Sequence, residues 1–357
     1  MPDNNDDNVA VPIRHILVTL AFSILSFFCL NSIGRKSDGP DSAMLRGHLF
    51  NTTTNYLKMP FLQWISAEPD SPHINPPIFG THGLVEYYPG TTNLVISVPH
   101  GGEMKPPFLP DRVKVPVQAA EGELKHNKET ADDDTNYRIT TAADIYTQEI
   151  AKIMVKEYNM ITGQKPYLIM ANLHRSKLDP NRPILQAAQG NGVCELVYKE
   201  YHNFIRSAKE ELGGPGLVID LHGQNHHQNS IEIGYLFKKS ELNNQDFTQT
   251  VPSIKNLQER TRTPITELLY GDDSLGAMFE SAGYNAVPSP RQEYPGKEKY
   301  YKGGYITQTH GSSDSGVIDA IQLELPAEIR HEGGETLRES FSKDLARILS
   351  KFIEKYY

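Results

Sequence analysis

The sequence predicts an α/β protein with a mixed, mostly parallel central sheet and helices on both faces of that sheet. Short apolar runs of strand length alternate with longer segments whose apolar residues recur at helical spacing, the pattern of parallel strands joined by helices. Polar residues follow several of the apolar runs, at the strand ends where open α/β sheets bind ligands. The 357 residues suffice for one large domain or two ordinary ones, and 38% of them are hydrophobic, enough to form a core.

Five apolar runs are predicted strands, and four longer segments with an apolar stripe are predicted helices. The first run ends in Pro-His-Gly-Gly, which indicates a buried strand that enters a loop. The third run is the most apolar, so we expect it to be central in the sheet. Gly271 and Gly276 weaken the third helix. The strands are 93–98, 166–171, 216–221, 231–237 and 320–325, and the helices are 141–158, 193–212, 264–282 and 337–357.

The N-terminal part of the chain has a different character. Residues 1–34 combine an acidic start, predicted to be disordered, with an uncharged apolar run at 16–33 that is either a signal peptide or a single-pass membrane anchor. Residues 35–90 are rich in Pro, Ser, Thr and Asn and are predicted to be a linker or lead-in. Asn51 begins a glycosylation sequon. These features predict the secretory pathway, with a secreted or membrane-anchored chain whose folded domain is 91–357.

Charge and cysteine content exclude some classes of protein. The net charge is −9 and the pI is near 5.8, which argues against a general nucleic-acid binder. Cys29 lies inside the apolar run, which leaves Cys194 alone in the folded part. An internal disulfide framework is therefore excluded.

Two histidines at strand ends are candidate metal ligands. His100 and Glu103 follow the first strand with two glycines between them, and we expect these glycines to let the backbone turn so that both side chains meet one ion. His222 follows the most apolar strand. Two histidines, one carboxylate and an open position for water form a known catalytic zinc set, and imidazole favours zinc over magnesium. Asp220 projects to the same side of its strand as His222 and can orient that imidazole.

Glu324 is the candidate general base. It alternates with apolar residues in the strand 320–325, and a carboxylate in so apolar a strand needs a partner. A zinc-bound water is such a partner, and Glu324 would take its proton and pass it to a leaving amine. A structural ion pair is the alternative.

The segment from Arg175 to Arg182 (RSKLDPNR) is a candidate substrate clamp. An arginine fork binds carboxylates through two hydrogen bonds, and Asn181 adds a directed one. The alternative is a solvated loop of arginine and aspartate residues.

A second candidate segment is 290–311, which is long, aromatic and rich in glycine. It is either a lid or wall over the substrate, with Arg291 and His310 as polar contacts, or an extended surface loop.

Taken together, these motifs resemble the N-formylglutamate amidohydrolase family, and they cover roughly residues 91 to 330 in the expected order. The motifs are Ser-Val-Pro-His100-Gly-Gly, Arg175 with Asp179-Pro-Asn181-Arg182, Asp220-Leu-His222-Gly, Tyr301-Lys-Gly-Gly-Tyr305-Ile-Thr with His310-Gly, and Gln322-Leu-Glu324. The resemblance implies a zinc-carboxypeptidase-like fold in which a His-x-x-Glu pair and a distant histidine hold Zn²⁺, a late glutamate is the general base, and an Asn-Arg pair holds a substrate carboxylate.

These roles fall on specific residues of this chain. The resemblance implies His100, Glu103 and His222 as zinc ligands, Glu324 as base, and Asn181 with Arg182 as carboxylate clamp; Asp179 and Asp220 would support the ligands. Gln308 stands where the family often has a basic residue, which leaves the metabolite open. If Glu103 is not a ligand, an acid from Asp132–Asp134 or Asp144 would replace it.

Three functions are consistent with these residues. The first is a zinc-dependent amidohydrolase that acts on a small N-acyl amino acid such as an N-formyl amino acid. The second is a secreted carboxypeptidase-like peptidase, which a long open groove would favour. The third is a secreted or matrix protein that keeps the fold but has no catalytic turnover. The presence of His100, His222 and Glu324 argues against this third function.

Overall fold

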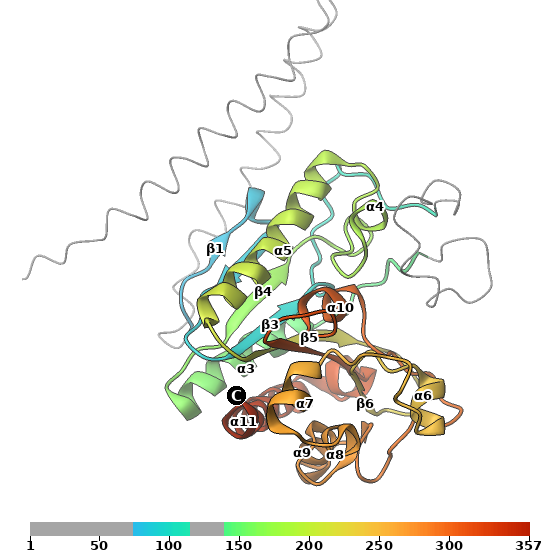
Figure 1. Ribbon diagram of the computed structural model, residues 1–357. Coiled ribbons are helices and arrows are strands. Elements are labelled where there is room, and N and C mark those ends of the chain that lie inside the picture. Colours follow the sequence, from blue (N-terminus) through green and yellow to red (C-terminus); the bar gives the residue numbers. More distant parts are fainter. Residues whose placement is uncertain (1–73, 115–138) are drawn as a thin grey trace, which may run out of the picture. The chain divides into compact units, whose positions relative to one another are not determined.

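The computed structural model describes residues 74–114 and 139–357, and within them eight strands form one sheet (Figure 1). The strand order is β1-β2-β4-β3-β5-β8-β6-β7. Neighbouring strands are parallel from β4 through β3 and β5 to β8, and also between β6 and β7, whereas β1/β2, β2/β4 and β6/β8 are antiparallel. The strands are Ile78–Phe79 (β1), Val85–Tyr88 (β2), Leu94–Val98 (β3), Tyr167–Ala171 (β4), Gly216–Gly223 (β5), Ile231–Gly234 (β6), Ala286–Val287 (β7) and Ile318–Leu325 (β8). The predicted mixed, mostly parallel sheet is confirmed.

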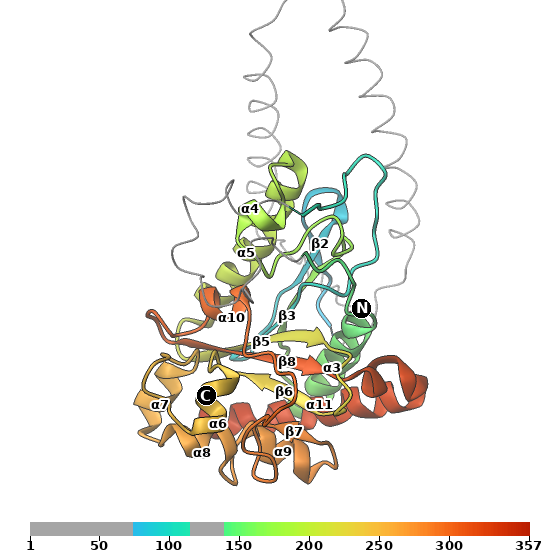
Figure 2. The ribbon, with the colours of Figure 1, turned by 90° about the vertical axis from the view of Figure 1, so that its right-hand side faces the viewer.

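Helices cover both faces of this sheet, as predicted (Figures 1 and 2). Alternate residues of β5 and β8 point to opposite faces: Ile219 and Leu323 pack in one apolar cluster with α3 and α11, and Val218 packs in another with α5. The helices are α3 (Thr147–Thr162), α4 (Ile184–Ala187), α5 (Gly192–Leu212), α6 (Lys239–Asn244), α7 (Lys255–Thr261), α8 (Ile265–Tyr270), α9 (Leu275–Ser281), α10 (Tyr305–His310) and α11 (Gly334–Tyr356), with short η1 (Thr81–Gly83) and η4 (Glu328–Glu332).

Local signals explain several helix boundaries. The Asn191 side chain accepts a hydrogen bond from the Cys194 amide and caps the start of α5, and Gly213 ends this helix with φ of +66°. The predicted helix 264–282 is wrong as one element, because it divides at Gly271 into α8 and α9. The predicted strand 231–237 ends earlier, at Gly234.

The sheet begins before the predicted domain boundary at residue 91, and that boundary is wrong. Strand β2 pairs with β4, and all four of its residues are buried. The lead-in assignment for 35–90 therefore does not hold for residues 78–88. The apolar run 16–33 and Asn51 lie outside the described residues, and so does Asp132–Asp134. Within 74–114 and 139–357, no helix is both long and apolar enough to span a bilayer.

The carboxyl ends of three parallel strands meet at one edge of the sheet. Strands β3 and β5 are neighbours, and β8 follows β5. His100 comes two residues after β3, while His222 and Glu324 are register partners near the ends of β5 and β8. This edge is where parallel sheets bind ligands.

Candidate metal centre

Two histidines and one aspartate converge at this edge. Asp144 Oδ2 lies 3.2 Å from His100 Nδ1 and 3.1 Å from His222 Nδ1, and the two imidazole centroids are 4.7 Å apart. His100, Asp144 and His222 are 1%, 6% and 2% exposed. In a tetrahedral zinc site with bonds of about 2.1 Å, ligand atoms lie roughly 3.4 Å apart. The two distances to Asp144 are slightly shorter than this, and the ligand atoms of the three residues all lie within 4.8 Å of one another.

The outer nitrogen of each imidazole contacts a second carboxylate. His100 Nε2 lies 2.6 Å from Asp179 Oδ1, and His222 Nε2 lies 2.8 Å from Asp220 Oδ2. Because a carboxylate can only accept, a proton on each Nε2 satisfies these contacts, and each Nδ1, which faces the Asp144 carboxylate, then needs either a second proton or a metal ion. Asp179 and Asp220 thus each contact one of the two imidazoles. The geometry fits metal ligands that are oriented from behind.

The three residues form a buried charged cluster. Burial raises the pKa of Asp144, but His100, His222 and Arg175 outweigh it and hold this pKa below its ordinary value. Burial lowers the pKa of His222, yet Asp220 and Asp144 outweigh it and raise this pKa well above its ordinary value. Three lone pairs that meet in a buried space need either protons or a metal ion. The donor set therefore fits a divalent metal.

The predicted ligand Glu103 does not join this group, and Asp144 takes its place. The chain after His100 runs extended beside residues 172–174, with the Met104 amide donating to Asn172 O at 2.9 Å. Glu103 is exposed, whereas His100 is 1% exposed, so the two side chains do not share one site. Asp144 is brought in by its own amide, which donates to His100 O at 2.9 Å.

The two glycines after His100 serve close packing. Neither has positive φ, so their backbone conformation does not itself require glycine. A Cβ at Gly102 would lie 2.4 Å from Ala171 O and from the Asn172 carbonyl carbon, and a Cβ at Gly101 would lie 2.6 Å from Thr147 Oγ1. The absence of side chains lets the His100 loop lie against the end of β4.

Glu324 lies beside the metal ligands on the next strand. It is in register with His222 on β5 and with Glu232 on β6, and register partners point to the same face of the sheet. Its side chain is 6% exposed, and Gln322 Nε2 donates to its Oε1 at 2.9 Å. Burial raises the pKa of Glu324 to about 8, against the attraction of the His222 charge. A carboxylate with this pKa accepts a proton more readily than an ordinary one.

The predicted clamp residues have different surroundings from one another. Arg175 is buried, with Nε donating to Asp179 Oδ2 at 3.1 Å and Nη1 lying 3.7 Å from Asp144 Oδ1. Asn181 Oδ1 accepts from the Ile306 amide at 2.8 Å, and its Nδ2 lies 3.0 Å from His222 Nε2, so this amide is engaged inside the protein. Arg182 is half-buried and donates from Nη1 to Asn181 O at 2.7 Å. Of the three, Arg182 keeps the most donor capacity.

Arg291 is the predicted contact that the structure does not bring to the site. Its side chain is 75% exposed, and its Nε lies 3.9 Å from Glu280 Oε2. Another member of the same segment, Tyr301, lies closer to the site: its amide donates to Glu232 Oε2 at 2.7 Å, and Glu232 is the register partner of Glu324. The Tyr301 ring stacks on His226, whose Nδ1 lies 2.6 Å from Glu232 Oε1.

His310, the other predicted contact in this segment, is buried in a histidine pair instead. Its Nε2 lies 2.8 Å from His202 Nδ1, and His202 Nε2 lies 3.0 Å from Pro180 O. Because a carbonyl only accepts, His202 donates to Pro180 and accepts from His310. Burial lowers the pKa of His202 to about 4. Two neutral imidazoles therefore support the turn that carries Asp179 and Asn181, a connection that no motif in the sequence indicated.

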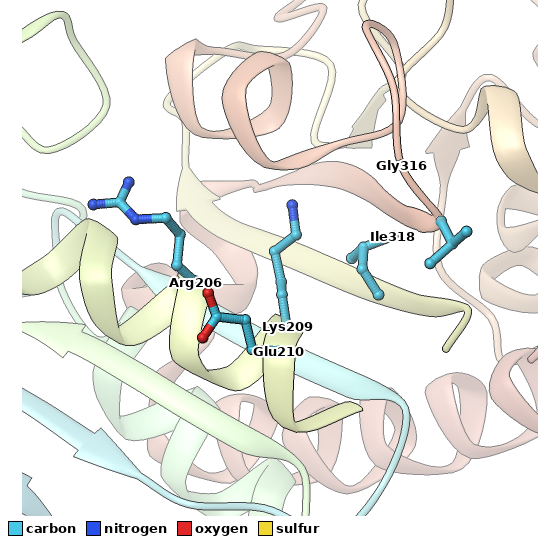
Figure 3. A pocket seen from close by; sticks show the side chains of 6 residues that line it. Arg206, Lys209, Glu210, Gly316 and Ile318 are labelled. Atoms are coloured by element: carbon cyan, nitrogen blue, oxygen red, sulfur yellow. The ribbon is translucent and has the colours of Figure 1, made fainter. Parts of the chain in front are cut away.

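A surface hollow of about 230 Å³ lies at the other end of the sheet (Figure 3). It is lined by Arg206, Lys209, Glu210, Gly316, Val317 and Ile318. Ile318 begins β8 and Glu324 lies six positions further along it, a separation of about 20 Å at strand spacing. The hollow is therefore separate from the metal centre.

No family model matches the sequence, and no curated protein sequence matches it. Among solved structures, the crystal structure of an N-formylglutamate amidohydrolase from Ralstonia eutropha JMP134 is similar to this chain, with a TM-score of 0.42 and 16% sequence identity over 74% of this chain and 94% of that chain. Its family is the one that the motifs resemble, but a likeness this distant carries no assignment. We base the functional proposal on the residues of this chain.

Proposed function

We propose that this protein is a zinc-dependent hydrolase that cleaves the amide bond of a small N-acyl amino acid. The observation that carries the proposal is the convergence of His100, Asp144 and His222 on one buried point, with Glu324 on the adjacent strand. Two imidazoles and one carboxylate suit zinc better than magnesium or calcium. A zinc ion at this point would supply Lewis-acid chemistry, polarising a carbonyl and lowering the pKa of a water.

The residues of the chain then have distinct tasks. Glu324 takes a proton from the attacking water and delivers it to the leaving nitrogen. Burial raises the pKa of Glu324 to about 8 in the metal-free site, and the charge of an ion bound beside it would lower this pKa, so that Glu324 is ionised when it takes the proton. Asp179 and Asp220 hold the two imidazoles in the orientation that presents Nδ1 to the ion.

Arg182 is the residue we assign to the carboxylate of the substrate. Its guanidinium has five N–H groups, and the hydrogen bond found for it within the described ranges uses one of them. Arg175 is committed to Asp179 and Asp144 and contributes positive charge behind the site. From the sequence alone, we also propose that residues 16–33 direct the chain to the secretory pathway.

Metal analysis and a substrate screen test this proposal. We expect near one zinc per chain, lost in the double variant His100→Ala and His222→Ala. Hydrolysis is screened on N-formyl, N-acetyl and peptide substrates with zinc added and with chelator. Glu324→Gln keeps zinc and loses about 10²- to 10⁴-fold in kcat, the usual contribution of a general base.

Glu103→Gln is the matched control, because Glu103 is a carboxylate of the same loop that faces outward. It should keep both zinc and activity. Purified protein that binds no zinc would overturn the proposed function. A Glu324→Gln variant with wild-type turnover would overturn the role of Glu324.

A further inference from the structure

Arg330 is a buried arginine at the same edge of the sheet as the metal centre. It lies in η4, just after β8, and is 2% exposed. Among the described residues it forms no ion pair with a carboxylate; its hydrogen bonds go to oxygens of the backbone and of one amide. Burying a charged guanidinium without a carboxylate partner costs free energy, which indicates that this arginine has a specific role.

The acceptors of Arg330 belong to the three segments that carry site residues. Nε donates to Leu325 O at 3.1 Å, Nη1 to Ile145 O at 3.3 Å, and Nη2 to Gln224 O at 3.0 Å and to Asn225 Oδ1 at 2.7 Å. Leu325 follows Glu324, Ile145 follows Asp144, and Gln224 comes two residues after His222. One rigid, planar group therefore joins the backbones beside two metal ligands and the candidate base.

The contact with the His222 segment is a close one. A Cβ at Gly223 would lie 2.2 Å from Arg330 Nε, so a glycine is required directly after His222 for the guanidinium to occupy its place. The main chain of η4 is held in turn, because Arg338 Nη1 donates to Arg330 O at 3.1 Å. The guanidinium is thus fixed from behind as well as by its acceptors.

We propose that Arg330 is a positioning residue for the metal centre: its guanidinium sets the mutual placement of the segments that carry Asp144, His222 and Glu324. This role rests on the proposed metal centre but adds a residue that does not contact the ion or the substrate. A lysine cannot replace the arginine, because one ammonium nitrogen cannot reach acceptors on three segments in fixed directions.

The test compares Arg330→Lys with Arg338→Lys. Both changes replace a buried guanidinium. Arg338 contacts Glu149, the Tyr146 ring and Arg330 O, so of the three segments it touches only 144–147. Hydrogen exchange of the metal-free proteins is measured at 144–147, 222–226 and 324–326. We expect Arg330→Lys to lose protection in all three segments together, and Arg338→Lys to keep it at 222–226 and 324–326.

Metal binding supplies a second readout. We expect Arg330→Lys to bind cobalt and zinc about 10- to 100-fold more weakly, the range seen when groups that orient metal ligands are removed, with a changed visible spectrum of bound cobalt. Arg338→Lys should keep the wild-type spectrum. If Arg330→Lys does not fold, Gly223→Ala takes its place, because it displaces the guanidinium and keeps its donors. We expect this variant to lose hydrogen-exchange protection in the same three segments.

The outcomes for Arg330→Lys and for the wild-type protein test two different claims. Wild-type protection and cobalt affinity in Arg330→Lys would overturn the positioning role, and so would loss of protection limited to 328–332. Wild-type protein that binds no metal would end the proposed function, while the exchange data would still decide whether Arg330 holds the three segments.

Discussion

The hydrogen bond between Asp220 and His222 offers the sharpest test of the metal centre. Asp220 is fully buried, and its Oδ1 accepts from Ser97 Oγ at 3.0 Å, while Ser97 Oγ lies 2.8 Å from the Tyr201 hydroxyl. Asp220 Oδ2 faces His222 Nε2 at 2.8 Å. In Asp220→Asn, we expect the new amide oxygen to keep the bond from Ser97, which turns the NH₂ group toward His222.

The substitution should then change which nitrogen of His222 carries the proton. An NH₂ group donates to Nε2 and moves the proton to Nδ1, the nitrogen that faces Asp144 and the proposed ion. A hydrogen bond to a charged group contributes about 1.5 to 3 kcal/mol, and removal of such a partner weakens metal binding about 10- to 100-fold. We therefore expect zinc affinity to fall by about 10- to 100-fold.

Competition with a chromophoric chelator at fixed pH measures this loss. Asp319→Asn is the matched control, because Asp319 is also fully buried in the sheet but bonds Ser312 and Tyr357 at the opposite end of β8. The control should lose stability and keep zinc affinity. Equal zinc affinity in Asp220→Asn and wild type would refute the assignment of Nδ1 as the ligand atom.

Two further predictions concern packing and pH. Gly102→Ala should weaken zinc binding at least tenfold while every ligand remains, because its Cβ would meet the backbone of Asn172 and push the His100 loop away; a variant with wild-type zinc affinity would contradict the packing argument. His202 has a folded pKa of about 4, below the ordinary value of about 6.5. The unfolded chain therefore binds the proton first, and stability falls as pH drops through this window. Between pH 7.5 and 5, wild type should lose about 2 kcal/mol more than His202→Gln in denaturant unfolding, and parallel pH curves would count against this.

The parts of the fold that the sequence predicts are those with a periodic signal. The apolar runs that became β3, β4, β5 and β8 are buried along their length, so their composition marks them. Parallel strands end at the same edge, and for that reason His100, His222 and Glu324 could be brought together from sequence. Strand β2 was missed because it lies in a segment rich in turn residues and pairs antiparallel at one side of the sheet.

Arg330, and the choice of Asp144 over Glu103, mark the limit of the sequence-based reasoning. Asp144 precedes a helix, and its place depends on a backbone hydrogen bond to His100 O, which any residue could make. The acceptors of Arg330 are mainly carbonyl oxygens, which leave no trace in the side-chain pattern. Glu103 was favoured because it matches a His-x-x-Glu motif, but the extended backbone after His100 overrides that spacing.

The glycines around the metal centre bear on how such a protein can lose its activity. At Gly101, Gly102, Gly223 and Gly304 an added methyl group would come within 2.2 to 2.6 Å of neighbouring atoms, at Gly304 the Asn181 amide. A mutation there would displace a ligand-bearing segment and leave every ligand in the sequence. The sequence would then still contain every metal-binding side chain, although the protein had lost its activity. These glycines take no part in the chemistry, but they are the positions to inspect first when an active protein has to be distinguished from an inactive relative.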